Sequence, residues 1–434
     1  MTLVQDRSLV DLRGVRHAYG KPGGAELLVL DNVDLTLKEK EVVGLLGRSG
    51  SGKSTLLRTI AGLIAPGSGA VVFPEKADGS RATVSMVFQS FALFPWLTVL
   101  QNVEVGLEAK RVAPEERRRR ALAAIDLIGL DGFESAYPKE LSGGMRQRVG
   151  LARALVVDPD ILLMDEPFSA LDVLTAETLR TDLLDLWIEG RMPISSILMV
   201  THNIEEAVLM CDRILVFSSN PGRVAAEIKV DLPRPRDRQD PGFRMLVEDI
   251  YVRMTERAAP GQPREGLFAG TGIGMPLPRV STNTMAGLME AVAGGPHDGK
   301  ADLPQLAHDL HYEADDLFPV AELLQLLRFA DLAGGDLSLL PAGRRYAEAE
   351  VDARKQLFAQ HLLAHVPLAA HIRRVLDDRA SHMAPARRFR DELEDFMSEE
   401  YAAQTLKSVI QWGRYAEIFA YDEDADLFSL DNPA

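Results

Sequence analysis

The chain has 434 residues, a formal net charge of −16 at pH 7 and one cysteine, Cys211. This length allows two or three domains with a substantial apolar core. A single cysteine excludes disulfides within the chain and fits a reducing cytosol. The sequence has no run of eighteen apolar residues and no signal-peptide pattern at its start, so we expect that the chain does not itself cross a membrane.

A strand, a glycine-rich turn and a helix are predicted for 42–61. The apolar run at 42–46 suits a buried strand, and 54–61 suits a helix whose N-terminus faces the turn. Between them, 47–54 carries the pattern G-x-x-x-x-G-K-[ST], whose glycines let backbone N–H groups face phosphate oxygens. Lys53 would reach the β- and γ-phosphates, and the Ser54 hydroxyl would bind Mg²⁺. The predicted nucleotide-binding residues here are Gly47, Arg48, Ser49, Gly50, Ser51, Gly52, Lys53, Ser54 and Thr55.

The next two segments differ in character. The segment 88–99 is too apolar for a free surface loop, which favours a docking site for another protein, although about half of its apolar side chains could simply pack inside a helical subdomain. The segment 114–128 is predicted to be a solvated amphipathic helix that begins at Pro114. Its arginines at 117–120 are therefore a poor candidate for binding nucleic acid.

An apolar strand at 161–166 ends in two carboxylates, Asp165 and Glu166. A strand of this kind can lie beside a phosphate loop. Asp165 would then hold Mg²⁺, usually through water, and Glu166 would polarise the attacking water.

The sequence LSGGMRQR at 141–148 resembles the signature motif of the ABC-transporter ATPases. Gln89, the sequence SALD at 169–172 and His202 stand around it in the order of that family, over roughly residues 9–228. The resemblance implies an α/β fold, namely a P-loop NTPase domain of the ABC ATPase type with a helical subdomain. It also implies ATP hydrolysis, with Mg²⁺ as cofactor.

The resemblance assigns roles to single residues. Gln89 would sense Mg²⁺ and the γ-phosphate, and His202 would hold the γ-phosphate. Tyr19 occupies the position of a ring that stacks on adenine, the alternative being an ordinary strand aromatic. The implied catalytic residues are Glu166, His202, Lys53 and Gln89. The implied metal-binding residues are Ser54, Gln89 and Asp165.

The family resemblance also implies a homodimer, in which two copies enclose two ATP molecules head to tail. The signature residues of one copy would meet the γ-phosphate held by the phosphate loop of the other, and Asp172 would bridge the two copies. The signature residues expected to act in this way are Ser142, Gly143, Gly144 and Gln147.

The amino-acid sequence is similar to that of the ATPases of nitrate, sulfonate, taurine and bicarbonate importers at 88–99, 168–172, 219–223 and 232–236. This implies a separate transmembrane permease, indirectly a solute-binding protein, and a place at the cytoplasmic face of the cell membrane. The alternative is a soluble ABC ATPase without a permease, whose C-terminal domain is regulatory or linked to DNA. A scaffold that binds ATP without hydrolysing it is disfavoured, because Glu166 and His202 are both present.

We predict an ATPase domain at 1–257, a linker at 258–278 and a mostly helical domain at 279–434. The linker is rich in glycine and proline. After it, helices at 285–292, 303–311 and 319–329, a glycine turn with a short strand near 334–340, and a helix from Pro341 resemble a winged helix. The pattern looks like a C-terminal domain associated with some ATPases of the nitrate/taurine subfamily. Further helices are predicted at 355–365, 371–379, 389–397 and 402–419.

The charge and the histidines of this domain limit the ligands that it is expected to bind. Residues 301–434 hold 13 Lys and Arg against 25 Asp and Glu, so nucleic acid is an unlikely partner, although Arg387, Arg388 and Arg390 could form a local basic face. His361 and His365 are one helical turn apart, a spacing that can bind Zn²⁺. No cysteine pair accompanies them, and they could instead flank a packed apolar stripe. A regulatory or assembly role is the expectation for this domain.

Overall fold

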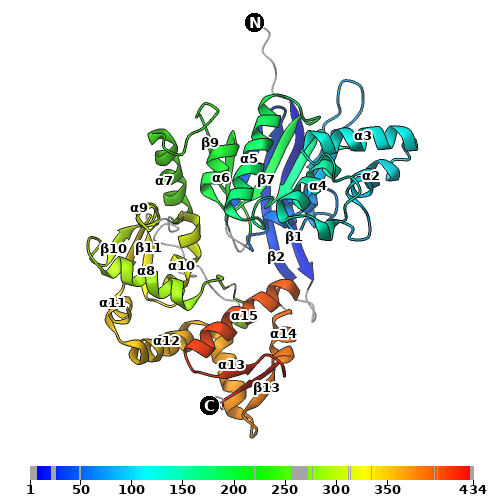
Figure 1. Ribbon diagram of the computed structural model, residues 1–434. Coiled ribbons are helices and arrows are strands. Elements are labelled where there is room, and N and C mark those ends of the chain that lie inside the picture. Colours follow the sequence, from blue (N-terminus) through cyan, green and yellow to red (C-terminus); the bar gives the residue numbers. More distant parts are fainter. Residues whose placement is uncertain are drawn as a thin grey trace. The chain divides into compact units, whose positions relative to one another are not determined.

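The computed structural model describes residues 7–20, 26–47, 50–218, 221–255, 272–275, 277–310, 312, 314–333, 335–394, 396–397 and 399–430. Residues 258–271 and 276 of the predicted linker lie outside this part, as do Arg48 and Ser49. The chain divides into two compact units (Figure 1). Unit 1 is Met1–Tyr19 with Leu28–Val247, and unit 2 is Gly20–Leu27 with Glu248–Ala434. The predicted domain boundaries stay predictions.

Unit 1 contains a six-stranded sheet with the order β5-β6-β7-β3-β8-β9, parallel except for β9. Every residue of β3, β6 and β7 is buried, as is typical of parallel strands covered on both faces. A second, three-stranded sheet has the order β2-β1-β4. The strands are β1 (Ser8–Gly20), β2 (Glu26–Lys38), β3 (Val42–Gly47), β4 (Ser68–Val72), β5 (Val84–Val87), β6 (Ile161–Asp165), β7 (Ser196–Thr201), β8 (Arg213–Phe217) and β9 (Val224–Lys229).

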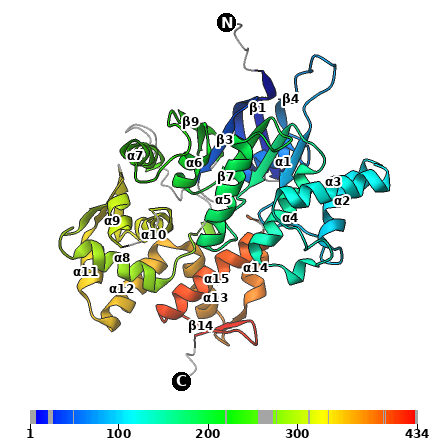
Figure 2. The same ribbon diagram turned by 45° about the horizontal axis from the view of Figure 1, so that its top comes forward.

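Three helices of unit 1 pack on one another as a helical subdomain, which Figure 2 shows beside the sheet. They are α2 (Val99–Ala109), α3 (Pro114–Leu127) and α4 (Gly143–Leu155), with the short helix η1 (Pro138–Glu140) before α4. The predicted α/β fold with a helical subdomain is therefore confirmed. The other helices of the unit are α1 (Lys53–Ile60), α5 (Val173–Ile188), α6 (Ile204–Met210) and α7 (Pro241–Thr255), the last of which runs into unit 2.

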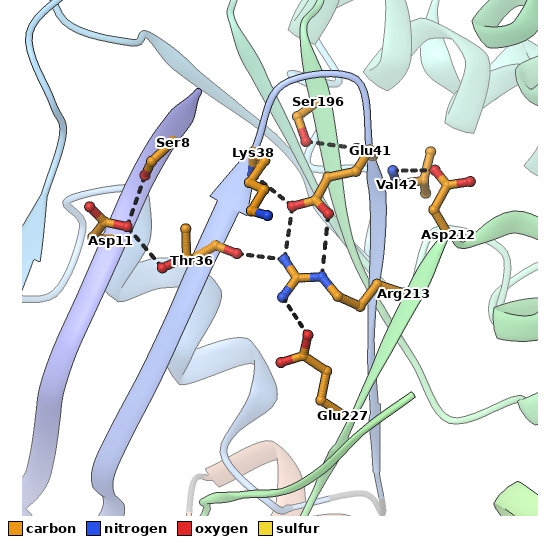
Figure 3. Close-up of polar contacts among 10 residues, drawn as sticks. All are labelled: Ser8, Asp11, Thr36, Lys38, Glu41, Val42, Ser196, Asp212, Arg213 and Glu227. Atoms are coloured by element: carbon orange, nitrogen blue, oxygen red, sulfur yellow. Dashed lines mark hydrogen bonds and ion pairs between the residues drawn. The ribbon is translucent and has the colours of Figure 1, made fainter. Parts of the chain in front are cut away.

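The amino ends of the parallel strands are tied together by a polar network around Glu41 (Figure 3). Arg213, the first residue of β8, donates to Oε1 of Glu41 at 2.8 Å, and Ser196 at the start of β7 donates to its carbonyl oxygen at 2.7 Å. Asp212 accepts from the N–H of Val42 at 2.9 Å. The network fixes the strands at the edge opposite to their carboxyl ends, where ligands of such sheets bind.

Unit 2 begins with a winged-helix arrangement, in the order helix, strand, helix, helix, strand, strand. Its three antiparallel strands have the order β10-β12-β11. The predicted winged-helix-like domain is thus confirmed. The elements are α8 (Thr282–Ala293), β10 (Lys300–Asp302), α9 (Leu303–Asp309), α10 (Ala314–Leu326), β11 (Ala330–Ala333) and β12 (Asp336–Leu339), followed by α11 (Pro341–Glu348) and α12 (Val351–His365); η2 (Gly272–Gly274) precedes them.

The same arrangement then occurs a second time. Its strands, again antiparallel, have the order β13-β15-β14, which matches the first sheet strand for strand. The sequence predicts the helices of this half but none of its strands, because three residues are too few to show an alternating pattern. Unit 2 is therefore a tandem repeat. The elements are α13 (Pro367–Asp378), β13 (Met383–Pro385), α14 (Ala386–Glu394), α15 (Glu399–Tyr415), β14 (Ala420–Asp422) and β15 (Leu427–Ser429).

Aromatic side chains form the core of the second repeat. The ring of Phe428 lies edge-on to the rings of Phe389 and Phe419, with centroids 5.3 and 5.1 Å apart. Trp412 of α15 is fully buried, and its Nε1 donates to the carbonyl oxygen of Val280 at 2.9 Å. Since Val280 precedes α8, this bond joins the second repeat to the start of the first.

Candidate functional site

The phosphate-loop pattern lies between β3 and α1, as predicted. Gly52 has a φ of 94°, a conformation that glycine adopts without strain. A Cβ atom on Gly47 would lie 2.7 Å from the carbonyl oxygen of Phe217 on the neighbouring strand β8, so only glycine fits there. The loop therefore turns tightly into the N-terminus of α1, where backbone N–H groups are free of partners within the helix.

Lys53 is buried at the start of α1. Its Nζ donates to the carbonyl oxygen of Gly47 at 2.6 Å, which closes the loop on itself. Burial lowers the pKa of Lys53 to about 8, although the nearby carboxylates of Glu166 and Asp165 oppose this shift. The loop thus presents a desolvated cation that an anionic ligand would stabilise.

Ser54 and Asp165 meet beside the loop. The Ser54 hydroxyl donates to Oδ1 of Asp165 at 2.7 Å. Burial raises the pKa of Asp165, while the hydrogen bond from Ser54 and the charge of Lys53 oppose the rise. A hydroxyl and a carboxylate that converge in this way are hard oxygen donors, the type that Mg²⁺ prefers, so the residues present fit this metal.

Glu166, the carboxylate that directly follows β6, contacts two of the other three predicted catalytic residues. Gln89 donates its Nε2 to Oε2 of Glu166 at 3.0 Å and to Oγ of Ser169 at 3.2 Å. His202 Nδ1 lies 3.4 Å from the same carboxylate oxygen. The backbone of Glu166 has a φ of 46°, a conformation that is uncommon for a residue other than glycine and recurs at functional sites.

These residues come together because of the sheet topology. Gln89, Glu166 and His202 follow the neighbouring strands β5, β6 and β7, and the phosphate loop follows β3, which pairs with β7. All four segments leave the carboxyl edge of one parallel sheet. Parts of the sequence that are more than a hundred residues apart thus form one site.

Tyr19 lies near the loop. Its hydroxyl is 3.4 Å from Oγ1 of Thr55, its side chain is exposed, and His17 packs edge-on to its ring with centroids 4.7 Å apart. This arrangement places the ring beside the phosphate loop. Its stacking on adenine stays a prediction.

The signature residues begin helix α4 of the helical subdomain. Ser142 is its exposed N-cap and accepts from the N–H of Met145 at 3.3 Å. A Cβ on Gly144 would lie 2.3 Å from Cγ2 of Thr175, so α4 packs closely on α5. Asp172 is the exposed N-cap of α5 and accepts from the N–H of Thr175 at 3.1 Å.

Gln147 differs from the other signature residues. It is 2 % exposed, and neither polar atom of its side chain has a hydrogen-bond partner in the described part of the chain. The subunit encloses this side chain, and its contact with a nucleotide on another copy stays a prediction. Gly144 is also buried, whereas Ser142 is exposed and Gly143 is half-buried.

The apolar segment 88–99 is partly packed and partly exposed. The buried Asn102 holds it, because its side chain accepts from the N–H of Phe94 and donates to the carbonyl oxygens of Phe94, Leu97 and Thr98. Trp96 is 69 % exposed, and its ring lies against that of Phe94 with centroids 5.6 Å apart. This segment therefore displays an apolar patch at Phe94, Pro95 and Trp96.

The other sequence candidates have internal partners. Arg119 pairs with Glu116 on α3, and Arg120 donates to the carbonyl oxygen of Val156 at 2.7 Å. His361 stacks on Phe329 with centroids 4.5 Å apart, and its Nδ1 lies 2.6 Å from the carbonyl oxygen of Leu327. The described residues contain no group of three or more ligands that could hold a metal ion around His361 and His365.

Comparisons with known proteins agree with this geometry. A family model described as ABC transporter matches residues 30–169, and one described as C-terminal AAA-associated domain matches 304–422. None of the helices in the described ranges has the length and apolar character of a membrane span.

Three relatives are named for the solute that they import. A nitrate import ATP-binding protein of Synechocystis is 47 % identical over 215 residues, which is 49 % of this chain and 79 % of that protein. An aliphatic sulfonates import ATP-binding protein of Mycobacterium is 45 % identical over 250 residues, 57 % of this chain and 95 % of its own length. A taurine import ATP-binding protein of Pseudomonas syringae is 42 % identical over 261 residues, 58 % of this chain and 98 % of the relative.

Proposed function

Since this chain belongs to the family of ABC-transporter ATP-binding proteins, we propose that it powers the uptake of a small anion such as nitrate, a sulfonate or taurine through a separate permease. The chain is an ATPase. One observation carries the mechanism, namely that Gln89, Glu166 and His202 converge beside the phosphate loop.

The phosphate loop would bind the triphosphate of ATP. Lys53, a buried cation, would exchange its contact with the carbonyl oxygen of Gly47 for the β- and γ-phosphates. Ser54, Asp165 and Gln89 would hold Mg²⁺, which neutralises charge on the phosphate oxygens when bound. This assignment rests on the convergence of the Ser54 hydroxyl and the Asp165 carboxylate.

Glu166 would act on the attacking water. Its carboxylate is fixed by the amide of Gln89 and lies next to His202, so it can accept a hydrogen bond from a water in line with the γ-phosphate. His202, whose side chain is half exposed, would donate to the γ-phosphate. Electrostatic stabilisation and positioning then supply most of the rate, as is typical of phosphoryl transfer.

A second copy of the chain would complete each site. Ser142 and Gly143 lie at the N-terminus of α4. A helix N-terminus favours binding of a phosphate, here one held by another molecule. Asp172 is exposed at the start of the neighbouring helix α5 and would contact the partner. Closure of this dimer around ATP, and reopening after hydrolysis, would drive the permease between its two orientations.

The apolar patch at Phe94, Pro95 and Trp96 would dock the permease, which holds the ATPase at the cytoplasmic face of the membrane. A solute-binding protein would then act on the permease from the other side. The acidic unit 2 would regulate or assemble the complex rather than bind nucleic acid. Each arginine of the basic face predicted from the sequence already has an acidic neighbour: Arg387 with Asp391, Arg388 with Glu392 and Arg390 with Asp426.

Copurification with membranes tests this proposal. Tagged chain expressed in its own host and extracted in mild detergent should bring down a multi-span membrane protein, and Trp96→Ala should lose it while keeping ATP binding. Tyr137→Ala, which changes an exposed aromatic outside the patch, is the matched control. Recovery of the chain without any membrane protein would contradict the importer assignment and favour the soluble ATPase.

A further inference from the structure

Two buried charged residues of unit 1, Arg180 and Glu206, lie close to the predicted catalytic residues Glu166 and His202. Arg180 is on α5 and Glu206 is in the first turn of α6, and their side chains are only 9 and 8 % exposed. Arg180 Nη2 is 3.7 Å from Oε2 of Glu206. The proposed mechanism has no role for either residue.

Each partner touches a segment that carries catalytic groups. The guanidinium of Arg180 lies over the ring of Phe168, 5.6 Å from its centroid, and Phe168 is two residues after Glu166. Glu206 follows His202 by four residues, in the first turn of α6. Asn203, the N-cap of α6, accepts from the N–H of Glu206 at 2.6 Å, so the position of this residue is tied to the loop that holds His202.

The pair is poorly arranged for stability alone. The Nε atom of Arg180 is buried without a hydrogen-bond partner in the described part of the chain, and its carboxylate partner lies beyond hydrogen-bond distance. Replacing a buried ion pair by apolar side chains is often neutral or stabilising, because two desolvated charges regain little more than their cost. A buried pair with this geometry calls for another explanation.

We propose that Arg180 and Glu206 are positioning residues, which set the relative placement of the loop after Glu166 and the helix after His202. This inference rests on the proposed hydrolysis by Glu166 and His202. Because Asp172 begins the same helix that carries Arg180, the pair also connects the predicted dimer contact to His202. If a partner displaces α5, Arg180 would move with it. Its guanidinium would then displace both Phe168, which follows Glu166, and Glu206, which follows His202.

A double substitution separates positioning from a structural role. Arg180→Met with Glu206→Leu removes both charges and keeps the volume, so the protein should retain its Tm and its affinity for ATP in a fluorescent-nucleotide titration. Its kcat should fall at least about tenfold, since small misplacements of catalytic groups cost this much or more. Glu206→Gln, which keeps the shape of the side chain, is the second variant and should also lower kcat.

The matched control is Arg213→Met with Glu41→Leu. This pair is also mostly buried, with side chains 16 and 15 % exposed, but it lies at the opposite edge of the sheet (Figure 3). Arg213 also donates to Glu227 and to the carbonyl oxygen of Thr36, so removal of this pair should lower Tm. It should leave kcat unchanged at a temperature where the protein is folded.

Two results would overturn the inference. One is an unchanged kcat in Arg180→Met/Glu206→Leu; the other is a loss of kcat that only accompanies a loss of Tm, as a structural role requires. In a His202→Ala background the double substitution should cause no further loss, and additive losses would also count against it. A wild-type chain that does not hydrolyse ATP would refute the proposed function instead, so the two failures are distinguishable.

Discussion

Unit 1 and unit 2 differ in how their sequences relate to their structures. In unit 1, short motifs with fixed spacing follow successive strands, so that Lys53, Glu166 and His202 meet at one edge of a sheet. In unit 2, one arrangement of helices and strands occurs twice, and its cores consist of packed aromatic and aliphatic side chains. Chemistry requires particular residues at particular places, whereas packing accepts many sequences of similar volume and pattern.

The largest expected effect is a loss of turnover in unit 1 when the predicted catalytic carboxylate is removed. Glu166→Gln should lower kcat by a factor of about 10² to 10⁴, because the water loses its base. ATP affinity should hardly change, since the phosphate loop is intact. Steady-state ATPase assays with permease present and nucleotide titrations check both parts, and near-normal turnover would refute the role of Glu166.

Lys53→Ala should weaken ATP binding. A hydrogen bond from a charged group contributes about 1.5–3 kcal/mol, so the Kd should rise about tenfold to a hundredfold. Arg58→Ala, which removes a more exposed cation from the same helix, is a suitable control and should bind ATP nearly as the wild type does. Equal affinity of Lys53→Ala and wild type would count against the phosphate-loop assignment.

Trp412→Ala should act on unit 2 and not on catalysis. Loss of this fully buried ring and of its bond to Val280 should lower the free energy of unfolding of unit 2 by about 3–5 kcal/mol. ATP turnover should persist at temperatures where unit 1 is folded. Calorimetry with parallel ATPase assays tests this. A matching loss of turnover would contradict the claim that catalysis depends on unit 1 alone.

The smallest expected effect is a pH dependence from Glu206. Burial raises the pKa of this carboxyl from 4.5 to about 7, although the charge of Arg180 on α5, a hydrogen bond with Thr201 and the nearby His202 oppose the rise, and Glu166 adds to it. The group titrates at a higher pH when folded than when unfolded. Its contribution to stability is therefore fully present below pH 4.5 and is lost as the pH rises through about 7.

Activity should change in the opposite direction. The ion pair with Arg180 forms as Glu206 loses its proton, so kcat of the wild type should rise between about pH 6 and pH 8 relative to Glu206→Gln. Unfolding free energy over pH 4.5 to 7 should fall in the wild type and stay level in the variant. Parallel pH profiles of the two proteins would contradict this account of Glu206.

The sequence predicts the site better than it predicts unit 2. The site is marked by glycines, Lys53 and paired acids at set positions. Such a pattern has few uses besides phosphate chemistry, so it predicts which residues lie together in the fold. The three-residue strands of the second repeat have no detectable period, which is why its fold follows only from the structure. The pairing of Arg180 with Glu206 cannot be predicted from the sequence either. Their side chains lie 26 residues apart in the sequence and meet only in the folded chain.

Mixing two inactive variants tests the composite site most directly. At an ATP concentration near the wild-type Kd, Lys53→Ala leaves the phosphate loop of its own chain mostly empty, and Ser142→Arg blocks the signature surface that would face a partner. If each site combines the two chains, a mixed dimer holds one intact site and one site with both defects. An equal mixture should then recover about a quarter of the wild-type ATPase rate, while each variant alone stays inactive. A mixture as inactive as its components, in dimers shown to exchange subunits, would contradict a site shared between two copies.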